Sequence, residues 1–275
     1  MKRRETAKHG DVKSKKFWDD QAKAYDAIHD EFAKTLGGKV DEQMSWEILK
    51  ENLPEDKSAK ILDAGGGTGR WTLPLVKIGY QVTLSDISSG LLRVAKEKLS
   101  KQGLFDRVEL REVNITNLPF ADDSFDFVLC WGGPLSCGDS ERAASELVRV
   151  LRKGGRILID AINRYYAALH RFEDDPSIAV KMVKSEFNGS PWGRVFGLEE
   201  FREMFEGRGI RVLAIYGRSS PDGLGVLDLL PKEIREAKEW SNETFSQLMN
   251  LMRYLNKDPS FIGIAGSLLL VGEKI

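Results

Sequence analysis

The amino-acid sequence predicts an α/β protein with a doubly wound, mostly parallel sheet that carries helices on both faces. Three observations indicate this class. Short apolar segments of strand character alternate with helical segments over most of the 275 residues, a glycine-rich turn follows the first of these strands, and an acidic residue ends the second. Alternating strands and helices are joined by right-handed crossovers, so the strands run mainly parallel.

The predicted elements follow one another in a regular order. Apolar residues at helical spacing predict a helix over 15–36, ended by Gly37 and Gly38, and a second helix over 40–52. Residues 15–52 are therefore expected to form two N-terminal helices. Strands are then predicted at 60–64, 81–86, 108–113, 125–131, 156–162, 211–216 and 261–271, and helices at 70–78, 89–101, 141–151 and 199–206.

Two segments interrupt this alternation and are expected to cover the ligand side of the sheet. Residues 163–197 follow one strand, and residues 218–260, with a helix predicted over 232–256, follow another. A segment that leaves the carboxyl end of a parallel strand starts at the edge where ligands bind. Both insertions are therefore predicted to form a helical cap. The aromatic residues of the first suit either an enclosed pocket for a small, partly apolar molecule or the core of the cap itself.

Composition narrows the functional classes. The 41 Lys and Arg residues balance 42 Asp and Glu residues, which gives no overall attraction to nucleic acid or to an anionic membrane. The length and the hydrophobic content of 41% fit one elaborated domain over residues 1–275. Two cysteines without a signal-peptide pattern favour a cytoplasmic protein, and three widely spaced histidines give no metal-ligand pattern. The longest apolar run, residues 261–271, is too short to cross a bilayer.

The most informative motif is the segment ILDAGGGTG at residues 61–69. Its glycines lie between a strand and a helix, where they permit a tight turn and let a ligand contact the backbone. Asp86 ends the next strand, 21 residues after Gly65, a position that suits the two hydroxyls of a ribose. The two features predict a nucleoside-containing ligand. The alternative is a purely structural turn, with Asp86 capping the helix that follows.

The glycine spacing does not fit the dinucleotide fingerprint G-x-G-x-x-G, because Arg70 stands at the sixth position from Gly65. The pattern present is D-x-G-x-G-x-G, from Asp63 to Gly69. Through LDAGGGTG, SDIS, NITNLPFADDSFDFVLC and ELVRVLRKGGRILI, in this order and spacing, the chain resembles the S-adenosylmethionine-dependent methyltransferases of the Rossmann-like class. The resemblance covers residues 15–217, and it implies a seven-stranded sheet whose last strand is antiparallel.

The resemblance also implies which residues hold the cofactor, S-adenosyl-L-methionine. The backbone at Gly65 and Gly67 would face its methionine part, and Asp63 would orient the amino group. Asp86 would hold the ribose hydroxyls. The remaining expected contacts, to adenine and to the methionine and methyl groups, are Ile87, Asn114, Ile115, Cys130, Trp131 and Gly132. Asn114 departs from the aspartate that is commoner in this family, but its side-chain oxygen can accept a hydrogen bond from the adenine amino group.

Two further groups of residues are expected near the site. Trp18 and Tyr25, in the predicted first helix, match an aromatic helix that often closes over the cofactor in this family, although core packing at helical spacing explains them equally well. His170 is the first candidate for a proton acceptor, because its segment leaves the fifth strand and imidazole titrates near neutrality. The other candidates are Tyr165, Tyr166, His29 and Asp139.

The predicted function is methyl transfer to a small-molecule acceptor. Displacement at a sulfonium requires alignment and exclusion of water more than a protein nucleophile. The turn WGGP at residues 131–134 lacks the Asn/Asp-Pro-Pro-aromatic pattern of enzymes that methylate bases, which disfavours nucleic acid as a partner. The alternatives are a methyltransferase acting on protein or RNA, and a non-catalytic cofactor-binding regulatory module. A homodimer through the cap is a further expectation.

Overall fold

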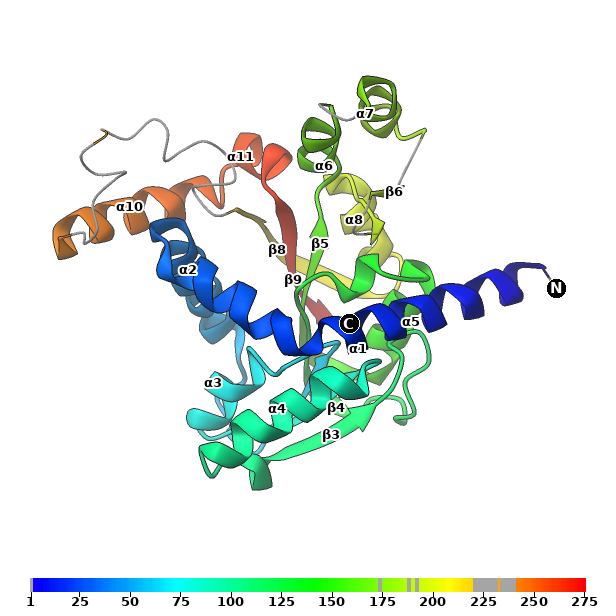
Figure 1. Cartoon of the computed structure of the whole chain (residues 1–275), viewed down its shortest axis with the longest axis vertical. Helices are drawn as coiled ribbons and strands as arrows, with labels where there is room; N and C mark the ends of the chain where they lie inside the picture. The colour runs from blue at the N-terminus through cyan, green and yellow to red at the C-terminus, as the bar shows by residue number, and fades with distance from the viewer. Residues whose placement is uncertain (1, 173–174, 187–188, 191–192, 220–231, 233–240) are drawn as a thin grey trace.

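The structure of the chain, a computed structural model, describes residues 2–172, 175–186, 189–190, 193–219, 232 and 241–275 (Figure 1). A seven-stranded sheet in the order β3-β2-β1-β4-β5-β9-β8 forms its centre. The strands are β1 (Lys60–Ala64), β2 (Gln81–Asp86), β3 (Val108–Glu112), β4 (Phe125–Cys130), β5 (Leu151–Ile162), β8 (Ile210–Arg218) and β9 (Ser267–Lys274). Strand β9 runs antiparallel to β5 and β8, whereas the pairs from β3 to β5 are parallel. The predicted doubly wound, Rossmann-like sheet with an antiparallel last strand is confirmed.

Helices cover both faces of the sheet. One layer contains α2 (Leu36–Asn52), α3 (Thr72–Lys77) and α4 (Ser89–Lys101), and the other contains α5 (Ser140–Val150) and α8 (Leu198–Glu206). Alternation along β4 divides the core between them, because Phe127 and Leu129 face the first layer while Val128 and Cys130 face the second. Burial on both faces explains the continuous apolar runs of the central strands.

The prediction that two glycines end the first helix is wrong. Helix α1 spans Lys2–Lys34 and α2 begins at Leu36, so the glycines lie inside the first turn of α2. The N-cap of α2 is Thr35, whose hydroxyl accepts a hydrogen bond from the Gly38 N–H (3.0 Å). A Cβ atom on Gly38 would lie 1.9 Å from the Phe32 carbonyl oxygen. Glycine therefore permits the close approach of the two helices at this junction.

The predicted strand at 261–271 is also wrong in its first part. Helix α11 (Pro259–Ile264) occupies that part, and β9 begins only at Ser267. The cause is local, because the Asp258 carboxylate accepts hydrogen bonds from the Ser260 and Phe261 N–H groups (2.8 and 3.4 Å) and Pro259 fits the first helical turn.

The described helices of the two insertions lie in the upper half of the view in Figure 1. The first contains α6 (Arg164–Arg171), α7 (Pro176–Val183) and a hairpin of β6 (Gly189–Ser190) and β7 (Gly193–Arg194). In the second, α10 (Asn242–Leu255) packs on α2 and α11, and the first half of the helix predicted over 232–256 falls mostly outside the described residues. None of the helices in the described ranges is long and apolar enough to cross a membrane.

Candidate functional site

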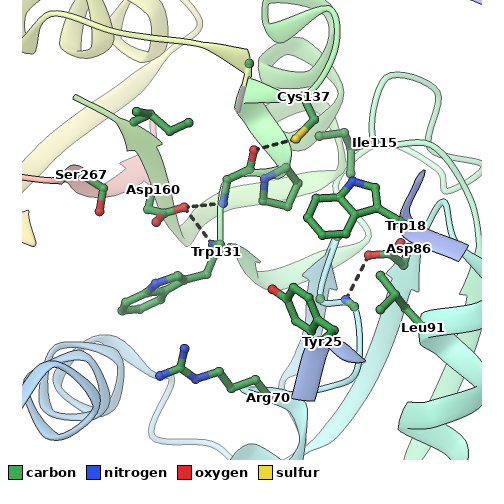
Figure 2. A pocket seen from close by; sticks show the side chains of 18 of the residues that line it. Trp18, Tyr25, Arg70, Asp86, Leu91, Ile115, Trp131, Cys137, Asp160 and Ser267 are labelled. Atoms are coloured by element: carbon green, nitrogen blue, oxygen red, sulfur yellow. Dashed lines mark hydrogen bonds between the residues drawn. The ribbon is translucent and has the colours of Figure 1, made fainter. Parts of the chain in front are cut away.

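A continuous cavity of about 950 Å³ lies at the carboxyl edge of the parallel strands, against α1. Figure 2 shows side chains that line it. Its walls come from α1, the glycine loop after β1, the turns after β2 to β5, and the ends of β8 and β9. The predicted site residues that line it are Trp18, Tyr25, Gly65, Gly67, Asp86, Ile87, Asn114, Ile115, Trp131 and Gly132.

The glycine loop forms one wall of this cavity. Gly65, Gly67 and Gly69 have positive φ angles of 72°, 55° and 75°, a region that favours glycine. A Cβ atom on Gly65 would lie 2.5 Å from the side chain of Pro134, so this loop packs closely against the turn after β4. The loop therefore presents bare backbone, which a ligand can approach closely.

Asp86 organises the glycine loop from the end of β2. Its Oδ2 accepts a hydrogen bond from the Gly67 N–H (3.0 Å), and its Oδ1 accepts one from the Ser88 N–H (2.8 Å). Burial raises the pKa of Asp86 to about 6 in spite of these bonds. Each carboxylate oxygen keeps further lone pairs, so Asp86 can also accept hydrogen bonds from two neighbouring hydroxyls in the cavity.

The cavity is apolar and aromatic around Asp86. The apolar residues there are Ile87, Leu91, Val113 and Ile115. Figure 2 shows Trp18 and Ile115 on the same side of the cavity as Asp86. The Asn114 Oδ1 already accepts the Thr116 N–H (3.0 Å) and keeps one further lone pair. This end therefore suits a flat, mostly apolar ring with a polar edge.

Asp63 lies beneath the glycine loop and does not line the cavity. Its Oδ2 accepts a hydrogen bond from the Thr72 hydroxyl (2.7 Å), and a Cβ atom on Gly66 would lie 2.4 Å from its carboxyl carbon. Burial, with a smaller contribution from the charge of Asp86, raises its pKa to about 6 in spite of the Thr72 hydrogen bond. Asp63 thus supports the loop from below, in contrast to the direct ligand contact that was expected.

Three other predicted residues also lie away from the cavity. Cys130 is fully buried in the core layer of α5 and α8, and burial raises the pKa of its thiol. Tyr165 and His170, on α6, are exposed. His170 packs against Tyr166 with ring centroids 4.3 Å apart, and it is Tyr166 that lines the cavity. The geometry therefore favours Tyr166 and His29 as groups within reach of a ligand.

Helix α1 forms a wall because Trp18, Tyr25 and His29 share one of its faces and line the cavity. The Tyr25 ring contacts Trp18 and His29 edge to face, with centroids 5.8 and 4.6 Å apart. Two carboxylates beside these rings fasten the helix. Asp19 accepts hydrogen bonds from the Ser88 hydroxyl (2.6 Å) and the Gly90 N–H (2.9 Å), and Asp26 accepts one from Thr68 (2.6 Å).

Three charged residues that sequence reasoning missed form a network at the other end of the cavity. Arg218, on β8, donates from Nη2 to Asp41 Oδ2 (2.9 Å) and from Nη1 to Asp160 Oδ2 (3.5 Å). Asp160, on β5, also accepts the N–H groups of Gly132 and Gly133 (2.9 and 3.0 Å), as Figure 2 shows. Burial raises the pKa of Asp160, and the charge of Arg218 opposes this shift. The network holds the turn after β4 in place.

Trp131 closes the wall above this network. Its ring contacts Trp71 (centroids 4.9 Å apart) on the glycine-loop side, and the Arg218 guanidinium lies 5.6 Å from its centroid. Its Nε1–H is buried and has no hydrogen-bond partner among the described atoms. This end of the cavity is therefore aromatic, with charged groups at its margin.

The sheet order, with a cavity at the glycine loop, defines a Rossmann-like α/β fold. Residues 61–155, from β1 into β5, match the family model described as "Methyltransferase domain". The ubiquinone/menaquinone biosynthesis C-methyltransferase UbiE of Haemophilus ducreyi is 37% identical over 106 residues, which are 38% of this chain and 41% of that protein. The matched part thus spans about two fifths of that relative's length.

Solved structures with the same fold cover more of the chain. The structure titled "Complex between the Haloferax volcanii Trm112 methyltransferase activator and the putative methyltransferase" has a matching chain with a TM-score of 0.60 and 18% identity over 94% of this chain and 97% of its own. The geranyl diphosphate C-methyltransferase of Streptomyces coelicolor, bound to Mg²⁺, geranyl diphosphate and S-adenosyl-L-homocysteine, has a TM-score of 0.57 and 17% identity over 85% and 79%. At these identities the likeness establishes the fold.

Proposed function

We propose that this chain is an S-adenosyl-L-methionine-dependent methyltransferase that acts on a small-molecule acceptor. The observation that carries the proposal is the continuity of one cavity from Asp86 and the glycine loop, past Trp131, to Ser267. Such a space fits a nucleoside at one end and a second molecule at the other. The relative named as a C-methyltransferase, and the neighbour bound to S-adenosyl-L-homocysteine, support this assignment.

The residues present fit this cofactor. The bare backbone at Gly65 and Gly67 would take its amino-acid part, and Asp86 would accept hydrogen bonds from the ribose hydroxyls. Ile115 and Trp18 would enclose the adenine ring. When bound, S-adenosyl-L-methionine supplies a methyl group on a positively charged sulfur, and the sulfur becomes a neutral thioether when the methyl group is transferred.

The chain's own contribution is enclosure, alignment and proton removal. The rings of Trp18, Tyr25 and Trp131 exclude water from the cavity and restrict how an acceptor can lie. An acceptor whose methylated atom carries a proton must lose that proton to give a neutral product. His29 lines the cavity, and burial together with the charge of Arg70 lowers its pKa. The lowered pKa favours the neutral imidazole, which is the form that can accept a proton.

The alternative of a non-catalytic regulatory module requires a filled or walled-off acceptor space. A cavity of about 950 Å³ that continues beyond Trp131 favours turnover instead. The balance of 41 basic and 42 acidic residues favours a small molecule over RNA. Pairing of two copies through the cap stays a prediction.

Calorimetry with S-adenosyl-L-homocysteine tests the proposal directly. We expect binding to the wild-type chain and a dissociation constant about 10- to 100-fold higher for Asp86→Ala, because hydrogen-bonded partners lose their acceptor. Asp106→Ala, which removes an exposed carboxylate that does not line the cavity, is the matched control and should not change the constant. A folded wild-type chain that does not bind this nucleoside would overturn the assignment. Transfer of labelled methyl groups to small-molecule extracts then identifies the acceptor.

A further inference from the structure

Two arginines line the cavity, and they differ in how their charge is balanced. Arg218 contacts the carboxylates of Asp41 and Asp160. Arg70, the first residue after the glycine loop, forms no ion pair with any carboxylate in the described part of the chain. Its contacts there are Nη1 to the His29 Nδ1 (3.4 Å) and the guanidinium 5.3 Å from the centroid of the Trp71 ring. Neither group neutralises its charge.

The position of Arg70 places this charge where a ligand can reach it. In Figure 2 its side chain extends away from Asp86 and toward the Trp131 end of the cavity. Its contact with Trp71, which packs against Trp131, agrees with that placement. If a nucleoside is held at Asp86, Arg70 would therefore contact the ligand group that lies at the opposite, Trp131 end of the cavity.

The neighbouring side chains experience the Arg70 charge. It lowers the pKa of His29 in addition to the effect of burial, and it opposes the burial that raises the pKa of Tyr25. Half-buried charge without a counter-ion is unfavourable, so this part of the cavity favours an anionic group. A guanidinium presents a planar fork that binds a carboxylate through two parallel hydrogen bonds.

We propose that Arg70 binds a ligand carboxylate in this cavity, an inference that rests on the proposed function and deepens it. The carboxylate has two possible sources. One is the amino-acid part of the cofactor, and the other is an acid group on the methyl acceptor. Both sources place the carboxylate at the Trp131 end, and binding experiments with different ligands distinguish one source from the other.

The first arm compares two nucleosides on wild type and Arg70→Gln by calorimetry. S-adenosyl-L-homocysteine carries a carboxylate, whereas 5′-methylthioadenosine shares its adenosine and lacks the amino-acid group. If the cofactor supplies the anion, Arg70→Gln weakens S-adenosyl-L-homocysteine binding about 10- to 100-fold and leaves 5′-methylthioadenosine binding unchanged. Arg70→Lys, which keeps the charge without the fork, should give a smaller loss.

The second arm uses benzoate and its uncharged match benzamide on protein saturated with S-adenosyl-L-homocysteine. If the acceptor supplies the anion, the wild type binds benzoate more tightly than benzamide, and Arg70→Gln removes this preference while leaving nucleoside binding unchanged. Quenching of tryptophan fluorescence measures the binding of benzoate and of benzamide, because Trp71 and Trp131 lie at this end of the cavity.

The controls separate this inference from the proposed function. Arg107→Gln, at an exposed arginine that contacts the Gly79 carbonyl (3.2 Å) outside the cavity, should match wild type in both arms. Thermal unfolding checks that Arg70→Gln is folded. The inference is wrong and the function stands if wild type binds the nucleosides and Arg70→Gln changes neither the affinity difference between the two nucleosides nor that between benzoate and benzamide. The same holds if Arg70→Gln weakens binding of both nucleosides equally. If folded wild type binds neither nucleoside, both fail.

Discussion

The two ends of the cavity are built in different ways. At the Asp86 end, ligand-facing groups follow β1, β2 and β3 directly, and backbone N–H groups bind the carboxylate. At the Trp131 end, the network of Asp41, Asp160 and Arg218 comes from α2, β5 and β8, and Arg218 and Asp41 are 177 positions apart. The first end is fixed by local backbone geometry that any chain of this fold can adopt. The second depends on tertiary contacts between distant segments, and under the proposed function it is the end where acceptor specificity would vary.

The largest effect should come from breaking the charged network at the Trp131 end. We expect Arg218→Met to lower the free energy of unfolding by about 3 kcal/mol, because Asp41 and Asp160 would keep buried charges without a cation. Urea denaturation at pH 7 measures the change. The control is Arg211→Met on the same strand, whose side chain is 59% exposed and pairs with Glu273 at the surface. It should cost no more than about 0.5 kcal/mol, and equal losses would contradict a special role for the network.

The difference between the two ends also decides what could be predicted from sequence. The Asp86 end was predictable because its signals are local: glycines directly after a strand, and an acid at the tip of the next strand. The network could not be predicted in the same way. Asp160 stands two residues before the predicted end of its strand, close to the equivalent of Asp86, but nothing in the sequence pairs it with Asp41 or Arg218.

Some predicted residues lie outside the cavity, and the reasons are physical causes of the same kind. The sequence pattern placed His170 in an insertion on the ligand side, and only the structure shows that it lies one turn beyond Tyr166 and outside the cavity. Asp63 was assigned to a ligand through the family resemblance, whereas packing under Gly66 puts it below the loop. In contrast, α11 had a readable signal, because Asp258 and Pro259 form a typical helix start within the apolar run.

The next prediction uses acid to weaken the Asp86 end alone. Asp86 has a pKa of about 6 in the free protein, and in the proposed site the ribose hydroxyls would donate hydrogen bonds to its ionised form. Affinity for S-adenosyl-L-homocysteine should therefore be constant above pH 7 and fall by up to about tenfold per unit below pH 6. Calorimetry between pH 5 and 8 would measure this fall.

The stability of the free protein should respond to Asp86 with the opposite sign. Because its folded-state pKa lies above the unfolded value, Asp86 binds a proton more tightly in the folded chain, and its protonation stabilises the fold as pH falls from 7 to 5.

The control for the pH dependence of binding is Asp63→Asn, because Asp63 shares a pKa of about 6 but does not line the cavity. The Asp63→Asn variant should bind S-adenosyl-L-homocysteine with the same pH dependence as wild type. If this pH dependence disappears in the variant, the titrating group is Asp63.

The smallest expected effect concerns the contacts that fasten α1 over the Asp86 end. Asp19 accepts hydrogen bonds from the Gly90 N–H and the Ser88 hydroxyl at the start of α4. Asp19→Ala leaves a helix-terminal N–H without this acceptor, so we expect a loss of about 1 kcal/mol in the free energy of unfolding. Trypsin should also cleave within α1 faster, and S-adenosyl-L-homocysteine should slow that cleavage.

The neighbouring Asp20 provides a matched control, because it is exposed on the same helix and removes the same charge. Asp20→Ala should leave both the unfolding free energy and the cleavage rate close to wild type. If the two variants behave alike, α1 is held mainly by Trp18 and Tyr25 packing into the cavity wall. In that case the Asp86 end, like the Trp131 end, would depend on contacts that local sequence does not reveal, and the contrast between the two ends would be smaller than the backbone geometry indicates.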